Sequence, residues 1–161
     1  MPQDQLSSSK LRKTLILGVG NILKGDDGLG VRVAQVLSQR ALPPDVIVEE
    51  IGTPGLDLVT YIEGWEKVII IDAVEMGEIP GTWKRFTPEE VKLIAGDEVL
   101  SLHEPNIADV LELGQALNIL PDEIVVYGVQ PQDLTYIERL SPQIEAIINN
   151  VADQILLEIW K

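Results

Sequence analysis

The strongest constraint on the fold is a short apolar run, Lys67-Val-Ile-Ile-Ile-Asp72, in which four β-branched residues follow one another. Such an uninterrupted run is typical of a strand that is covered on both faces. Strands are also predicted at residues 14–19, 46–51, 82–86 and 123–129, with 82–86 at a sheet edge. Helices are predicted over residues 28–40, 56–62, 105–117 and 141–159, with one more beginning at Thr87-Pro88. This alternation predicts an α/β fold: a mainly parallel or mixed, twisted sheet of about five strands with helices on both faces.

The length of 161 residues fits one domain, which we expect to span residues 13–161. Residues 1–12 are polar and are expected to form a flexible tail. The apolar run that follows is broken by Gly18 and Gly20, unlike a signal peptide. No apolar segment approaches the roughly 20 residues that span a bilayer, so we expect no membrane insertion.

Charge and cysteine content exclude several functions. The chain has 12 Lys and Arg against 26 Asp and Glu, a net charge of −14 that disfavours nucleic acid as a partner. It has no cysteine, which excludes disulfides, thiol catalysis and thiolate metal sites, and which fits a cytoplasmic location. His103 is the single histidine, so any site that needs an imidazole must use it.

The first predicted strand leads into a glycine-rich loop, Gly18-Val-Gly-Asn-Ile-Leu-Lys-Gly-Asp-Asp-Gly-Leu-Gly30. It departs from a dinucleotide-binding loop because Leu23 stands where the third glycine is needed, and because Asp26 and Asp27 would repel a pyrophosphate. The loop instead suits a cation or a hydrogen-bonded turn. An alternative is that one of the two aspartates caps the helix that begins near Gly28.

Two further residues complete a candidate site. Asp72 ends the most apolar strand, where open α/β sheets place their ligands, although hydrogen bonding to the next turn is an alternative use. His103 precedes a helix, where a structural role is the alternative. If Asp27, Asp72 and His103 meet at one sheet edge, they form a metal site with open positions for Zn²⁺, Ni²⁺ or a similar ion. Water bound in an open position is then activated for hydrolysis.

The chain resembles the hydrogenase maturation endopeptidases in five blocks that occur in the same order between Gly18 and Pro131. The blocks are GVGNILKGDDGLG, the Gly52-Thr-Pro-Gly55 turn, IIIDAVEMG, HEPNIADVL and YGVQP. Members of that family clip a C-terminal extension from the large subunit of nickel–iron hydrogenases after nickel insertion. The order and spacing of the blocks are more specific than any single glycine loop.

The resemblance implies a role for each matched residue. Asp27, Asp72 and His103 correspond to residues that bind a metal at the cleavage site, and Asp26 matches a recurrent acidic position that orients the loop or the scissile region. These four are the predicted catalytic residues, while Asn21 is expected to tie the loop together by hydrogen bonds. The implied metal is nickel carried by the substrate, with zinc or cadmium as substitutes. Two departures from the family are the extended N-terminal tail and Glu104 after His103.

Three functional hypotheses follow. The first is an aspartate-dependent endopeptidase that processes a nickel–iron hydrogenase large-subunit precursor, with nickel as the recognition element and an aspartate as proton acceptor. The second is a scaffold that checks nickel in the large subunit without cutting it. The third is an unrelated peptidase on the same fold, which would cleave peptides regardless of nickel.

Overall fold

The computed structural model describes residues 13–96 and 106–161 and contains one five-stranded sheet of order β2-β1-β3-β5-β4. The strands are β1 (Thr14–Gly18), β2 (Val46–Glu50), β3 (Lys67–Ala73), β4 (Trp83–Phe86) and β5 (Glu123–Val129). All neighbouring pairs are parallel except β4 and β5, which are antiparallel. The predicted α/β fold is therefore confirmed, with β4 at the sheet edge as expected.

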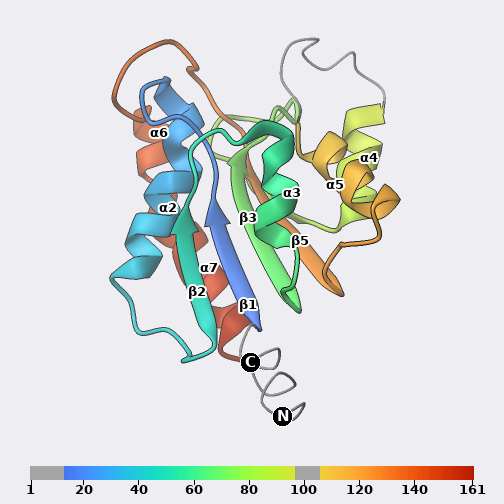
Figure 1. The fold of residues 1–161 in the computed structure, drawn as a ribbon. Helices are drawn as coiled ribbons and strands as arrows, with labels where there is room; N and C mark the ends of the chain where they lie inside the picture. The colour runs from blue at the N-terminus through green and yellow to red at the C-terminus, as the bar shows by residue number, and fades with distance from the viewer. Residues whose placement is uncertain (1–12, 97–105) are drawn as a thin grey trace, which may run out of the picture.

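Helices cover both faces of this sheet (Figure 1). They are α2 (Leu29–Ser38), α3 (Leu58–Ile62), α4 (Pro88–Gly96), α5 (Ile107–Ala116), α6 (Pro142–Glu145) and α7 (Ile148–Ile159), with short 3₁₀ helices η1 (Gly25–Gly28) and η2 (Gly55–Asp57). Thr87 and Glu90 form reciprocal hydrogen bonds at the start of α4, as expected from the predicted cap.

The prediction of one continuous helix over 141–159 is wrong, because the segment breaks into α6 and α7. At the break, the Ile147 N–H donates to the Ile144 carbonyl three residues back instead of four. The tighter turn lets Ile144 and Ile148, on either side of it, both pack into the core, where they are almost fully buried. Burial of these two side chains compensates for the interrupted helical hydrogen bonding.

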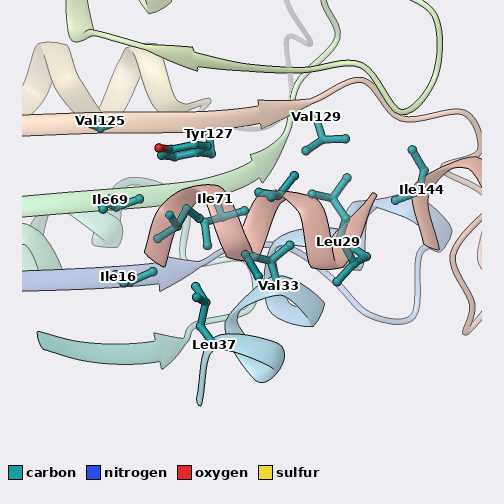
Figure 2. Close-up of a cluster of buried hydrophobic side chains, with 14 of the residues drawn as sticks. Ile16, Leu29, Val33, Leu37, Ile69, Ile71, Val125, Tyr127, Val129 and Ile144 are labelled. Carbon is teal, nitrogen blue, oxygen red and sulfur yellow. The ribbon is translucent and has the colours of Figure 1, made fainter. Parts of the chain in front are cut away.

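The side chains of β3 point alternately to the two faces of the sheet and pack into two separate hydrophobic cores. Ile69 and Ile71 pack with α2 and α7 on one face, as Figure 2 shows, where Leu29 and Val33 of α2 approach them. Val68 and Ile70 point to the other face and pack with α3 and α5. All four β3 side chains are fully buried, which explains why the strand has no polar residue between Lys67 and Asp72.

The parallel register brings the polar ends of the central strands to one edge of the sheet. Gly18 of β1 pairs with Ile71 of β3, and Asp72 pairs with Gly128 of β5. The loops that follow β1, β2 and β3 therefore all leave the sheet at the same edge, where α/β folds place their sites. Within residues 13–96 and 106–161, no helix is both long and apolar enough to cross a membrane.

A partly buried polar cluster around Glu158 lies on α7 near the other end of the sheet. Glu158 pairs with Lys67 at 2.7 Å and with Arg85 at 2.7 Å, and it accepts a hydrogen bond from the Tyr127 hydroxyl. Burial alone would raise the pKa of Glu158, but these three donors lower it to about 2. The cluster joins α7 to β3, β4 and β5.

We expect Glu158→Gln to lower the free energy of unfolding by roughly 2 kcal/mol near neutral pH. Because the folded state holds Glu158 at a pKa below its ordinary value of 4.5, its contribution is present above that value and disappears as the pH falls toward 2. Urea denaturation of the native protein and of Glu158→Gln, at pH values from 7 down to 3, measures how the difference between their free energies of unfolding shrinks. Glu145→Gln, which removes an exposed pair with Arg32, is the control and should change stability by under about 0.5 kcal/mol. A stability difference that does not narrow with falling pH would contradict the assignment.

Candidate active site

Asp27 and Asp72 line the same pocket at the carboxyl edge of the sheet. The turn at Thr53, Pro54 and Gly55 after β2 forms another part of its wall. The remaining lining residues come from the loop after β1 and from α3 and α5: Val19, Gly20, Leu58, Asn106, Ile107 and Val110. Four of the five sequence blocks that carry the family resemblance thus contribute to one cavity.

Two glycines allow η1 and α2 to lie against the strand ends. Gly20 has a φ of +136°, and a Cβ there would collide with the Asp27 carbonyl oxygen. A Cβ on Gly30 would collide with the carbonyl oxygens of Ile71 and Val19. These close approaches between backbones require glycine, and they bring Asp27 beside the end of β3.

The loop between β1 and η1 holds Asp27 by its backbone. The Asn21 N–H donates to Asp27 Oδ2 at 2.8 Å, and Asn21 Oδ1 accepts from the Leu23 N–H at 2.9 Å. The expectation that Asn21 ties the loop together is therefore confirmed. Asp27 Oδ1 has no hydrogen-bond partner within the described residues, which leaves one carboxylate oxygen for a ligand.

Asp72 is held in a similar way. Its Oδ1 accepts a hydrogen bond from the Ala73 N–H at 2.8 Å, while Oδ2 has no hydrogen-bond partner in the part of the chain that the structure describes. Burial, and then the charge of the nearby Asp27, raise the pKa of Asp72 well above its ordinary value. A carboxyl whose pKa is raised by burial and by a neighbouring carboxylate is a typical feature of functional sites.

This donor set fits a divalent ion in its chemistry but is incomplete by itself. Among residues 13–96 and 106–161, no three His, Cys, Asp or Glu side chains form a group that could hold a metal. Asp27 and Asp72 supply two carboxylates, which favour hard or borderline cations. His103 lies outside the described residues, so the predicted set of Asp27, Asp72 and His103 stays a prediction.

Asp26 faces away from this pair although it is adjacent to Asp27 in the chain. It is fully buried, and its two oxygens accept four hydrogen bonds from the segment after β5. The donors are the backbone N–H groups of Gln132, Asp133 and Ser141 and the hydroxyl of Ser141, at 2.7–2.9 Å. These contacts support the expectation that Asp26 orients the loop, while a part in catalysis stays a prediction.

The alternative that Asp26 or Asp27 caps α2 is wrong. The N-cap of α2 is Gly28, and no side chain provides a capping hydrogen bond there. Each aspartate instead accepts from backbone N–H groups elsewhere, Asp27 from within its own loop and Asp26 from residues more than 100 positions later.

Sequence reasoning assigned no role to Gln130, which the structure places as a clamp on the loop after β3. Gln130 is 4% exposed, and its Oε1 accepts from the Met76 N–H at 2.7 Å. Its Nε2 donates to the Glu75 carboxylate at 2.8 Å. A polar residue that directly follows a buried strand and precedes a proline was the available signal. Gln130 thereby fixes the course of the chain a few residues beyond Asp72.

Comparison with known proteins agrees with this architecture. The model of the family described as hydrogenase maturation protease matches residues 31–158. The hydrogenase 2 maturation protease of Escherichia coli is 34% identical over 146 residues, covering 89% of this chain and 88% of the relative. The hydrogenase expression/formation protein HupD of Bradyrhizobium diazoefficiens is 37% identical over 129 residues, which cover 80% of this chain.

Some relatives are longer than the matched region. The alignment spans 67% of the length of that HupD, and only 58% of the hydrogenase expression/formation protein HoxM of Azotobacter vinelandii, which is 40% identical. Among solved structures, the hydrogenase maturating endopeptidase HybD from Escherichia coli superimposes with a TM-score of 0.80 at 34% identity, covering 91% of each chain. With a matching family model and relatives above 30% identity over most of its length, the chain belongs to the hydrogenase maturation protease family, whose members are peptidases.

Proposed function

We propose that this protein removes the C-terminal extension of a nickel–iron hydrogenase large-subunit precursor after nickel has been inserted. The observation that carries the proposal is the pocket in which Asp27 and Asp72 stand together, in a chain of the maturation protease family. Each carboxylate is anchored through one oxygen by a backbone N–H. An anchored carboxylate keeps its second oxygen in a fixed place for substrate.

The nickel ion in this proposal belongs to the substrate and serves as the recognition element. Asp27, Asp72 and His103 would contact it with oxygen and nitrogen donors, which suit a borderline cation such as Ni²⁺. The chain has no cysteine, so it offers no thiolate that would compete for the substrate's metal. Zinc or cadmium, which accept the same donors, are proposed as substitutes at this site.

Hydrolysis requires a proton acceptor for the attacking water and a proton donor for the leaving amine. The water oxygen bonds to the peptide carbonyl carbon, the C–N bond breaks, and the amine nitrogen takes up a proton. One of the two carboxyls of the pocket would carry that proton, since Asp27 and Asp72 are each anchored through one oxygen only. The other carboxyl would hold the substrate in the same pocket. We further propose that this reaction takes place in the cytoplasm. A protein without cysteines forms no disulfide bonds, so its folding does not depend on an oxidising compartment.

Mass spectrometry of a purified large-subunit precursor incubated with this protein tests the proposal. We expect a released C-terminal peptide from the nickel-loaded precursor and an intact chain from the nickel-free precursor. Cleavage of both forms at equal rates would overturn nickel recognition and favour a peptidase of broader action.

A non-cleaving scaffold that checks nickel is the second candidate. An intact nickel-loaded precursor in a stable complex with this protein, isolated by gel filtration, would favour it. The pair of carboxylates in one pocket supports cleavage, because hydrolysis needs a group that accepts a proton from the attacking water, whereas a scaffold needs only contacts to the metal.

A further inference from the structure

A second pocket adjoins the first and is mostly apolar. Its wall is formed by residues from the end of β3, the edge strand β4, β5, α4 and α5: Ala73, Val74, Phe86, Val91, Ile94, Ile107, Ala108 and Val126. The polar residues Asp72, Glu75 and Asn106 also line it. Asp72, Asn106 and Ile107 line both pockets, so the two cavities share a wall beside the candidate catalytic carboxyl.

The loop after β3 is built to keep this second pocket in place. The Val74 N–H donates to the Val129 carbonyl at 3.0 Å, and Gln130 clamps Glu75 and Met76. Gly128 provides the space for Val74, because a Cβ on Gly128 would approach Val74 Cγ2 at 2.9 Å. A concave, mostly apolar surface whose loop is held by hydrogen bonds is typical of a preformed binding subsite.

We infer that this apolar pocket binds one uncharged apolar side chain of the precursor, from a residue next to the scissile bond. The inference rests on the proposed function. Because Asp72 lines both pockets, a polypeptide whose scissile carbonyl lies beside Asp72 can place a neighbouring side chain in the apolar pocket that Val74 and Ala108 line. Most of the wall consists of apolar side chains, which favour an apolar side chain over a charged one, and the Glu75 carboxylate already accepts a hydrogen bond from Gln130.

Ala108→Leu tests the subsite by filling it from α5. Ala108 lines the apolar pocket and is only partly buried, so the larger side chain has room without displacing the core. Ala116→Leu, at the other end of the same helix and exposed, is the matched control. Nickel-loaded precursors with Leu, Gly or Lys at each position flanking the scissile bond are the substrates, and circular dichroism checks that each variant is folded.

The native protein should show a KM roughly tenfold to hundredfold lower for the Leu precursor than for the Gly precursor at one of the flanking positions. Ala108→Leu should remove most of that preference while leaving kcat for the Gly precursor within about twofold, and Ala116→Leu should retain it. If Ala108→Leu does not fold, Val74→Ala takes its place and is also given a precursor with Trp at the same position. It should lower the KM for the Trp precursor relative to the Leu precursor, when compared with the native protein.

Equal KM values for the Leu and Gly precursors, or a preference for Lys, would overturn the inference while cleavage itself stands. If the native protein binds the precursors without cutting them, the proposed cleavage fails. The ratio of Kd values for the Leu and Gly precursors then tests the pocket in the same way.

Discussion

Asp72→Asn and Asp27→Asn, each made alone, should lower the rate of precursor cleavage by roughly 10²–10⁴-fold while the protein remains folded. Asparagine has nearly the shape of aspartate and keeps an acceptor oxygen for the Ala73 or Asn21 N–H. It removes the negative charge and the site that takes up a proton. The loss is therefore expected in kcat with the nickel-loaded precursor, measured by single-turnover cleavage and mass spectrometry.

The stability of the same variants separates a catalytic role from a structural one. Burial and the charge of Asp27 disfavour the ionised form of Asp72 in the folded state. A neutral residue at position 72 relieves that unfavourable charge, so Asp72→Asn should not lower the free energy of unfolding. Loss of cleavage without loss of stability is the pattern of a residue retained for function.

Asp57→Asn is the control for these two variants. Asp57 is an exposed aspartate of η2 at the same edge of the sheet, and it does not line the pocket of Asp27 and Asp72. Its replacement changes the net charge by the same amount and should leave cleavage within about twofold. Full cleavage by Asp72→Asn, or a comparable loss in Asp57→Asn, would contradict the assignment of the site.

The fold was predictable because its main determinants are local. The apolar run from Lys67 to Asp72 has only one explanation in a protein of this length, which is a central strand covered on both faces. The glycines after β1 and the Thr87-Pro88 helix start are equally local signals. They predicted the end of β1 to within one residue and the start of α4 correctly. The break between α6 and α7 was missed because neither Gly nor Pro marks it, and only the packing of Ile144 and Ile148 favours it.

The candidate site was predictable in part. Strand order and parallel pairing brought Asp27 and Asp72 to one pocket, as implied by the position of Asp72 at the end of a strand and of Asp27 in the loop after another. The partners of Asp26 could not be inferred, because its hydrogen bonds reach residues more than 100 positions later in a segment without a regular pattern. The apolar pocket at Val74 was also missed, since it depends on how the edge strand β4 and helix α4 pack together.

The second large expected effect is a loss of stability when Asp26, which accepts four hydrogen bonds, is replaced. Asp26→Ala should lower the free energy of unfolding by about 3–5 kcal/mol, because it leaves three backbone N–H groups and the Ser141 hydroxyl without their shared acceptor. Urea denaturation of the folded variant measures the loss. Ser141→Ala removes only the hydroxyl donor and is expected to cost about 1 kcal/mol.

Hydrogen exchange locates the effect within the molecule. In Asp26→Ala, the amides of Gln132, Asp133 and Ser141 should exchange fastest relative to the native protein, while those of β3 follow the global loss of stability. Under conditions where the variant is folded, cleavage should fall far less than in Asp27→Asn, since Asp26 acts by holding the loop. If Asp26→Ala abolished cleavage while the free energy of unfolding and the three amides were unchanged, Asp26 would be a catalytic residue and the loop-orienting role would be wrong. The four hydrogen bonds argue for the opposite result, because Asp26 is fully buried, is held by the segment after β5 and does not line the pocket of Asp27 and Asp72.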